Sequence, residues 1–199
     1  MQQAKDKVQI ILDTATRYFT RYGYNKTSLD EIASEARIAK GTIYYYYQSK
    51  EDLFMSVMER KTKEFYNAMI QRIESSKGFE AKLRAFLHTP VKHAYENMPI
   101  LIEGLKNIPF SYRDKFKYFR KENRKSMLQL LTSILAIGKE EGLLADGTDI
   151  EKLSEVINDW FLLGDTNFEV IDTEKLLQMI ERDHEKIIQM ILYGIVKRG

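Results

Sequence analysis

Apolar residues recur at steps of three and four positions along almost the whole chain, which is the spacing of one face of an α-helix. The first such segment runs from Lys5 to Tyr22, and the last runs from Glu174 to Lys197. Residues that interrupt helices are scarce, because the 199 residues include only 3 prolines and 10 glycines. The pattern therefore predicts an all-α fold of about nine helices.

The helices between these two segments follow from the same periodicity, and their ends carry capping signals. Gly23 is expected to end the first helix, and Ser28 with Glu31 forms a capping box at the start of the second. Thr148 and Glu151 have the same spacing ahead of a later helix. The expected ranges are 28–36, 41–47, 53–75, 79–96, 100–107, 112–141 and 152–168.

The second and third helices are short and separated by a tight turn, as in a helix-turn-helix unit. We therefore expect an N-terminal DNA-binding domain over residues 1–52 and a larger helical domain over residues 53–199. The long helix over residues 53–75 is expected to belong to both halves.

Composition excludes several classes of site. The chain has no cysteine and only 3 histidines, so we expect no disulfide, no zinc site and no cofactor. No apolar run reaches the roughly 20 residues of a membrane span, and the N-terminus lacks the features of a signal peptide, so we expect a cytoplasmic protein without a membrane partner. The formal net charge is +2, and residues 1–60 hold 9 basic and 8 acidic side chains. Contact with an anion must therefore depend on local placement of charge.

Four consecutive tyrosines occupy the third helix, and a helix that turns about 100° per residue cannot bury all of them on one face. Ile43 and Tyr47 share one direction and are expected to face the core. Tyr45 then points away from the core, with Tyr44 and Tyr46 on the two flanks. An exposed aromatic ridge is costly unless it meets a partner, and tyrosine hydroxyls bind phosphates. The alternative is that the rings pack within a small three-helix core.

The segment from Ile10 to Phe54 resembles the DNA-binding domain of TetR/AcrR-family transcriptional repressors. The residues that carry the resemblance are Thr27, Ile32, Ala33, Ala36, Gly41, Thr42, Tyr44, Tyr46, Lys50, Glu51 and Leu53. The resemblance implies a repressor that binds a near-palindromic double-stranded DNA operator as a homodimer. It also implies release from DNA when a small, largely apolar or amphipathic effector binds the larger domain.

The resemblance also assigns roles in DNA binding. Thr42 and Tyr45 are expected to probe base edges, while Tyr44, Tyr46 and Lys50 grip phosphates. The positions that match DNA contacts of the family are Thr27, Ser28, Lys40, Thr42, Tyr44, Tyr45, Tyr46 and Lys50. Gly41 is expected to allow a close approach of the backbone.

Two residues depart from the family pattern. Arg37 stands where the turn usually has glycine, which costs about 1 kcal/mol if the backbone is left-handed there. Arg37 is also expected to add a phosphate contact. Ala39 stands where the third helix usually has a serine N-cap, a loss of roughly 0.5–2 kcal/mol.

The family resemblance implies dimerisation through the last two helices, which would form a four-helix bundle across the interface. The candidate interface residues are Phe161, Gly164, Phe168, Ile180, Ile187, Ile188 and Ile191. The same residues would suit the core of a single subunit, and that alternative remains open.

An effector pocket is expected between the middle helices, lined by apolar residues with a few polar ones. The candidates are Phe86, His88, Met98, Leu101, Glu103, Leu105, Phe116, Phe119, Met127 and Trp160. Each of these would also suit an ordinary core position.

Two other classes of function compete with a repressor. An enzyme is not expected, because the chain has no Gly-rich phosphate loop, metal-ligand cluster or G-x-S-x-G elbow. A helical adaptor is the second rival, in which the tyrosine run binds protein rather than DNA.

Overall fold

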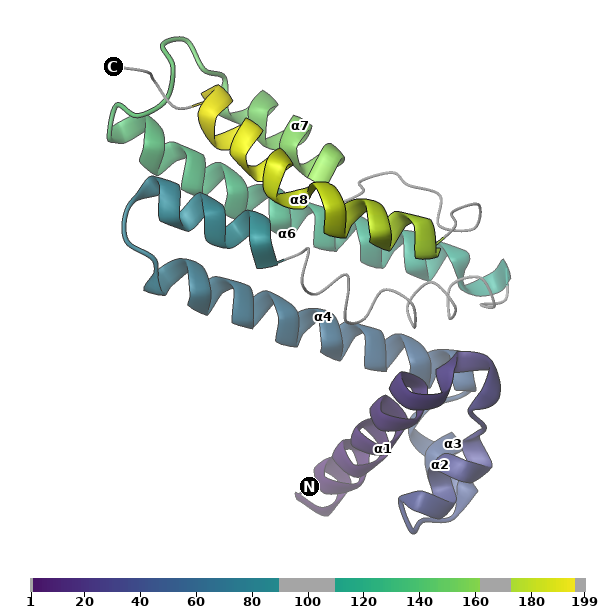
Figure 1. Ribbon diagram of the computed structural model, residues 1–199. Coiled ribbons are helices and arrows are strands. Elements are labelled where there is room, and N and C mark those ends of the chain that lie inside the picture. The colour runs from purple at the N-terminus through teal and green to yellow at the C-terminus, as the bar shows by residue number, and fades with distance from the viewer. Residues whose placement is uncertain (1, 90–109, 162–172, 196–199) are drawn as a thin grey trace. The chain divides into compact units, whose positions relative to one another are not determined.

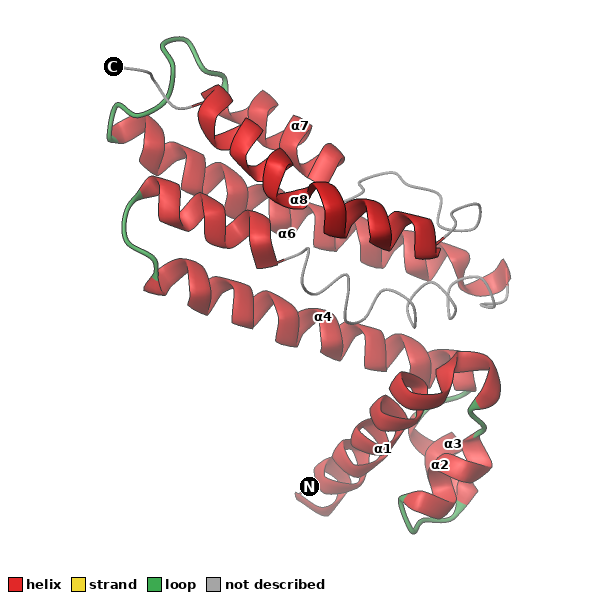
Figure 2. Cartoon of the chain, in the orientation of Figure 1, coloured by secondary structure: helices red, strands yellow, loops and turns green. Residues whose placement is uncertain are grey.

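The computed structural model describes residues 2–89, 110–161 and 173–195, and the regular elements in these ranges are helices (Figures 1 and 2). The elements are α1 (Gln2–Lys26), α2 (Leu29–Glu35), α3 (Lys40–Tyr46), α4 (Lys50–Ser75), a helix over residues 79–89, a 3-10 turn (Phe110–Tyr112), α6 (Arg113–Glu140), α7 (Ile150–Phe161) and α8 (Thr173–Ile195). The predicted all-α fold is confirmed, and the short helix expected over residues 100–107 lies outside the described residues. None of the helices described is long and apolar enough to cross a membrane.

The chain divides into two compact units, and the division falls inside α4 between Glu64 and Phe65. The first unit contains residues 1–64 together with a segment that ends at Phe116, and the second contains the rest. The long helix expected to be shared by two halves is thus α4. The domain limits of 1–52 and 53–199 remain predictions.

In the first unit, α4 is attached to α1 by the side chain of Arg60. Its guanidinium donates to a carboxylate oxygen of Asp13 over 2.6 Å and to the carbonyl oxygen of Leu12 over 3.0 Å, and it also contacts the hydroxyl of Thr16. The rings of Phe19 and Phe54 meet edge to face beneath, with centroids 5.2 Å apart. These contacts explain why α4 stays with the N-terminal unit beyond residue 52.

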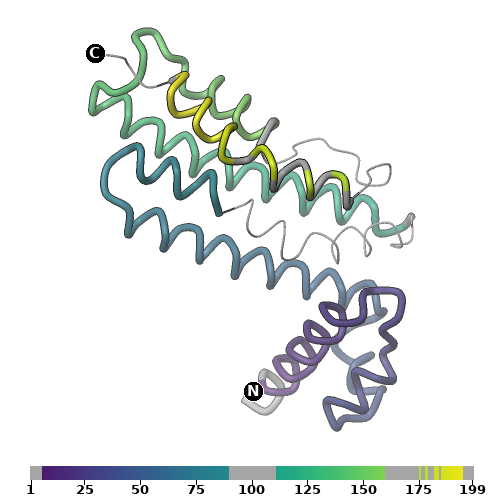
Figure 3. Tube along the Cα trace, viewed as in Figure 1, coloured from purple at the N-terminus to yellow at the C-terminus, as the bar shows by residue number. Residues whose placement is uncertain are grey.

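The described residues of the second unit form an apolar cluster, which the periodic stripes of its helices fill. The helix over residues 79–89 runs beside α6 (Figure 3), and residues of α7 and α8 contribute to the cluster. Buried members of the cluster include Phe79, Leu83, Phe86, Leu131, Ile134, Leu135, Ile157, Ile188 and Leu192. Burial of side chains of this size stabilises a fold by about 1.5–3 kcal/mol each.

The capping signals have mixed outcomes. The capping box of Ser28 and Glu31 is present, and the backbone leaves the helical conformation at Gly23, where φ is 81° and ψ is 167°. The box predicted from Thr148 is wrong, because Asp149 takes the capping position one residue later. Its carboxylate accepts from the amide nitrogens of Glu151 and Lys152 over 3.1 and 3.0 Å. A carboxylate accepts two amides at once and also favours the positive end of the helix dipole.

Candidate nucleic-acid interface

The turn between α2 and α3 is held by its backbone. Ile32 of α2 and Ile43 of α3 are both fully buried, so the two short helices share one core. Arg37 lies in the left-handed region with φ at 53°, and the amide of Ile38 donates to the carbonyl of Ala33 over 3.0 Å. Ala39 precedes α3 without a side-chain cap. The two expected consequences of the sequence departures, a strained Arg37 and an uncapped α3, are therefore present.

The tyrosine run divides as the helical geometry predicts. Tyr47 is 9% exposed, whereas Tyr45 is 81% exposed and Tyr44 is 49% exposed. Tyr46 is half-buried, and its ring meets that of Tyr45 edge to face with centroids 4.9 Å apart. The outward face of α3 is consequently an exposed aromatic surface.

A polar groove of about 510 Å³ lies beside this surface, where α2, α3 and the start of α4 meet. Its lining residues are Asn25, Thr27, Ser28, Leu29, Lys40, Tyr44, Gln48, Ser49, Lys50 and Glu51. Five residues predicted to contact DNA are brought together here, although they are up to 23 positions apart in the chain: Thr27, Ser28, Lys40, Tyr44 and Lys50. Gln48 also lines the groove, although it was not among the predicted DNA contacts. Its position between the tyrosine run and Ser49 could have indicated this.

Thr27 differs from its predicted role in DNA contact. The side chain is 2% exposed, and its hydroxyl donates to the carbonyl oxygen of Gly23 over 2.8 Å. The same hydroxyl lies 3.3 Å from the carbonyl oxygen of Tyr18, so Thr27 ties the end of α1 together across the kink. Thr27 therefore also has a structural role, and the half-buried Ser28 provides a second hydroxyl to the groove lining.

Lys40 is positioned by two neighbours at the start of α3. Its ammonium donates to a carboxylate oxygen of Asp30 over 2.7 Å and lies 6.0 Å from the centre of the Tyr44 ring. The hydrogen bond to Asp30 raises the pKa of Lys40 above its ordinary value, so the side chain stays protonated at neutral pH. The cation is held beside Tyr44 at the groove.

Lys50 begins α4, and its ammonium lies 4.2 Å from the centre of the Tyr24 ring. The Tyr24 hydroxyl donates to a carboxylate oxygen of Glu51 over 2.7 Å. Burial, followed by the bond to Glu51, raises the pKa of Tyr24 far above its ordinary value, so the phenol remains a donor. The Tyr24 ring thus makes a cation–π contact with Lys50 at the N-terminus of α4, which is the positive end of the helix dipole.

The start of α4 also contacts the 3-10 turn and the first residues of α6. The hydroxyls of Ser49 and Tyr112 are 2.8 Å apart, and Lys115 donates to Asp52 over 3.2 Å. Ser49 in turn accepts from the amide of Asp52 over 3.0 Å and so caps α4. The groove wall is therefore supported by residues that lie more than 60 positions later in the chain.

The residues predicted to line an effector pocket differ in their burial and contacts, and some of them lie outside the described residues. Phe86 and Met127 are buried in the core of the second unit, and His88 pairs with Glu185 at 3.2 Å. Their role in an effector pocket remains a prediction. Phe116 and Phe119 are half-buried. Met98, Leu101, Glu103 and Leu105 lie outside the described residues, as does the side chain of Trp160.

The candidate dimer residues are also only partly described. Gly164 and Phe168 lie outside the described residues, as do the side chains of Phe161 and Ile180. Ile188 was expected in the dimer interface, but it is fully buried in the core of its own subunit. Ile191 packs against that core. Ile187 is 40% exposed, whereas the unpredicted Met190 and Tyr193 are 73% and 66% exposed.

The sequence model described as "Bacterial regulatory proteins, tetR family" matches residues 11–57, which include the whole of α2 and α3. The chain is 28% identical over 160 residues to the fatty acid metabolism regulator protein of Bacillus subtilis (strain 168), which covers 79% of this chain and 80% of the relative. It is 43% identical over 58 residues to the HTH-type transcriptional regulator AcrR of Shigella flexneri, which covers 29% of this chain and 27% of that relative.

Solved structures show the same fold. A transcriptional regulator from Cytophaga hutchinsonii ATCC 33406 superposes with a TM-score of 0.77 at 20% identity, covering 96% of this chain and 99% of that chain. The transcriptional regulator FadR from Bacillus subtilis, in complex with stearoyl-CoA, superposes with a TM-score of 0.66 at 22% identity, covering 94% of this chain and 99% of the other. These similar proteins are transcriptional regulators rather than enzymes.

Proposed function

We propose that this chain, which belongs to the TetR family of bacterial regulatory proteins, is a ligand-responsive repressor that binds a near-palindromic operator as a homodimer. The repressor leaves the operator when a small, largely apolar or amphipathic molecule binds its larger half. The observation that carries the proposal is the exposed Tyr45 on α3, next to a groove that holds Lys40 and Lys50.

The interface suits the two kinds of contact that DNA requires. Tyr45 and Thr42 project from the exposed face of α3 and meet base edges in the major groove. The hydroxyls of Ser28 and Tyr44 and the ammonium of Lys50 bind phosphates, which set the orientation of the protein on the duplex. Operator specificity then comes from α3, and affinity comes mostly from the groove.

The exposed face of α8 supports the proposed homodimer. Ile187, Met190 and Tyr193 are three residues apart and large, and all are exposed in the single subunit. Val156 on α7 is exposed as well, at 45%. Apolar side chains at this spacing on two helices suit a four-helix bundle between two subunits. Two copies of α3 then read half-sites about 34–36 Å apart, one turn of DNA.

The effector is proposed by analogy with the relatives. The B. subtilis regulator FadR was solved in complex with stearoyl-CoA, and the 28% identical relative is named for fatty acid metabolism. A long-chain acyl thioester is amphipathic, so stearoyl-CoA is the first effector to test. It releases the operator only if it binds one state of the repressor more tightly than the other, and α4, which belongs to both units, carries the change.

The test is fluorescence anisotropy with duplex DNA from the region upstream of the protein's own gene, against a scrambled duplex at the same salt concentration. Saturable binding by two subunits per site is expected, at least about a hundredfold tighter than for scrambled DNA. The Tyr45→Ala variant is expected to lose roughly tenfold in operator affinity. Tyr118→Ala is the matched control, because Tyr118 is an exposed tyrosine on α6.

Equal affinity for both duplexes would call for selection from a random DNA library. If that selection enriched no site, the repressor proposal would be wrong and a protein-binding role for the tyrosine surface would replace it. Addition of stearoyl-CoA to the preformed complex tests the effector separately, because operator binding itself does not require it.

A further inference from the structure

The second unit carries a local excess of positive charge on the first half of its α6 segment. Residues 117–125 hold five lysines and arginines against one acidic residue, whereas the whole chain has a formal net charge of +2. The DNA-binding surface described above is built from α2, α3 and the start of α4, so it does not use these side chains. A concentration of one sign of charge attracts a ligand of the opposite sign.

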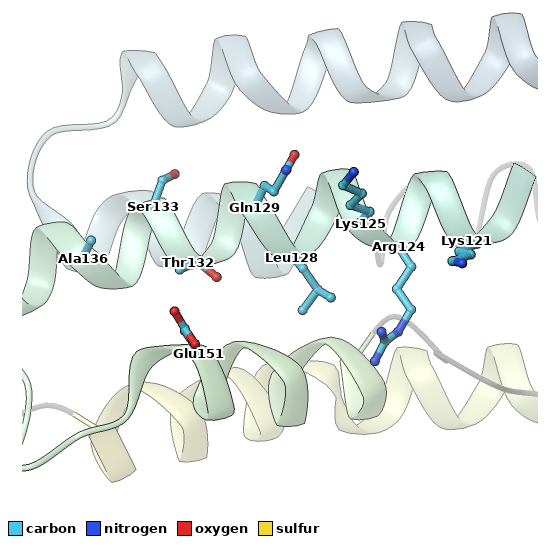
Figure 4. A pocket seen from close by; sticks show the side chains of 9 residues that line it. All are labelled: Lys121, Arg124, Lys125, Leu128, Gln129, Thr132, Ser133, Ala136 and Glu151. Atoms are coloured by element: carbon cyan, nitrogen blue, oxygen red, sulfur yellow. The ribbon is translucent and has the colours of Figure 1, made fainter.

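Three of these cations line one end of a groove of about 700 Å³ on α6 (Figure 4). Its lining residues are Lys121, Arg124, Lys125, Leu128, Gln129, Thr132, Ser133, Ala136 and Glu151. The volume lies within the range of roughly 300–1,000 Å³ that holds small molecules. The groove therefore has room for an organic ligand as well as an inorganic ion.

The groove changes character along its length. Lys125, Gln129 and Ser133 follow one another at four-residue steps, and so form one row along α6. Arg124, Leu128 and Thr132 form the parallel row, and Leu128 points into the space between α6 and α7. Beyond the cations, the lining thus offers the apolar side chains of Leu128 and Ala136 between hydrogen-bonding groups.

The cations at the basic end are not equivalent. Arg124 donates to a carboxylate oxygen of Asp159 over 2.6 Å, and this bond lowers the pKa of Asp159 below its ordinary value. Much of the Arg124 charge is thereby compensated. Lys121 and Lys125 are exposed, and neither forms an ion pair with any residue that the structure describes. These two ammonium groups remain to bind an anion.

Lys121 and Lys125 are four residues apart on one helix, so their side chains leave the same face with Cβ atoms about 6 Å apart. Two flexible ammonium groups at this spacing close on a phosphate from both sides, because its oxygens accept in several directions. An apolar body attached to that phosphate would lie along Leu128 and Ala136.

We propose that this groove binds a small molecule that carries a phosphate group on an apolar body, with the phosphate between Lys121 and Lys125. The proposal goes beyond the DNA-binding function and does not depend on it. It assigns to the outer face of α6 a site that is separate from the operator-binding surface.

The experiment is isothermal titration calorimetry of the full chain with octyl phosphate, in a buffer that contains no phosphate and no DNA. One saturable site per chain is expected. Inorganic phosphate and octan-1-ol, which each carry only half of the ligand chemistry, are expected to bind at least about tenfold more weakly. The double variant Lys121→Glu with Lys125→Glu is expected to lose about tenfold or more in affinity for octyl phosphate.

Two further variants separate charge from shape. Lys77→Glu with Lys139→Glu makes the same change of charge at exposed lysines of the second unit outside the groove, and is expected to bind octyl phosphate as the parent does. Ser133→Trp keeps every cation and fills the groove, so it is expected to weaken binding. Circular dichroism is the control that checks whether each variant is folded.

Three results would overturn the proposal. The first is the absence of saturable binding by the parent chain. The second is an equal loss in the two charge-reversal variants, which would indicate attraction to net charge alone. The third is equal affinity for octyl phosphate and inorganic phosphate, which would reduce the site to an anion patch.

Discussion

The ring of Phe79 lies directly over the Cα of Gly138, so a Cβ added at residue 138 would come within 2.7 Å of the ring atom Cδ2. Both residues are buried in the second unit, Phe79 at the start of the helix over residues 79–89 and Gly138 near the end of α6. The missing side chain is what allows these two helices to approach each other.

Gly138→Ala is therefore expected to destabilise the protein, although alanine usually favours a helix. The inserted methyl group forces the Phe79 ring or the backbone to move, at a cost of about 1–3 kcal/mol in the free energy of unfolding. Urea denaturation measures the change. Gly194→Ala in α8 is the matched control, because the added Cβ meets no other described residue within 4 Å apart from its chain neighbours and the backbone of α8 itself. The control is expected to be neutral or stabilising by up to about 1 kcal/mol, and an unchanged Gly138→Ala protein would contradict the close approach.

The backbone at Arg37 is left-handed, with φ at 53°, so a change to glycine there is expected to stabilise the protein. Arg37→Gly is expected to raise the free energy of unfolding by about 1 kcal/mol, since glycine has no Cβ that clashes in this conformation. Arg84→Gly, at an exposed position within the helix over residues 79–89, is expected to lower it by about the same amount. Thermal denaturation of both variants tests the pair, and equal destabilisation would show that Arg37 is not strained.

The sequence predicted the interface best where periodicity alone decides the outcome. Ile43, Tyr45 and Tyr47 take the directions that a turn of 100° per residue requires, and their burial follows. The burial of Thr27 was not predicted, because it depends on the kink at Gly23 and on the bond from its hydroxyl to the Gly23 carbonyl. Such a bond is a property of the folded backbone, and no spacing rule contains it.

The apolar stripe of α8 shows a second limit. Ile187 and Ile188 are adjacent and chemically identical, yet one is 40% exposed and the other is fully buried. Periodicity gives the relative directions of neighbouring side chains, but the rotation of α8 against α6 and the helix over residues 79–89 decides which of them faces inward. Met190 and Tyr193 were missed for the same reason, because the outer face is defined only once the inner face is packed.

The capping box of α2 predicts a dependence of stability on pH. Glu31 accepts from the hydroxyl and amide of Ser28, each over 2.8 Å, and these bonds lower the pKa of Glu31 below its ordinary value of 4.5. A carboxyl whose pKa is lower in the folded protein contributes stability above pH 4.5, and loses it as the pH falls through the folded value.

Glu31→Gln is therefore expected to reduce the loss of stability between about pH 5 and pH 3, measured by urea denaturation across that range. Ser28→Ala removes the hydroxyl donor and is expected to flatten the same part of the curve. The double variant should lose little more of the pH dependence than either single change, because the two residues act through one interaction. Independent, additive effects would contradict this coupling.

The exposed pair Met190 and Tyr193 tests the proposed dimer. Met190→Glu with Tyr193→Glu places two like charges on α8 near their own copies across a two-fold axis, where burial without a partner is unfavourable. The variant is expected to sediment as a monomer in analytical ultracentrifugation, while its circular dichroism remains helical. Tyr118→Glu removes an exposed tyrosine of the same size from α6 and is expected to leave the dimer intact. Operator affinity should fall with the loss of the dimer, because a monomer contacts one half-site and about half of the phosphates. A dimeric double variant would assign the subunit interface to another surface.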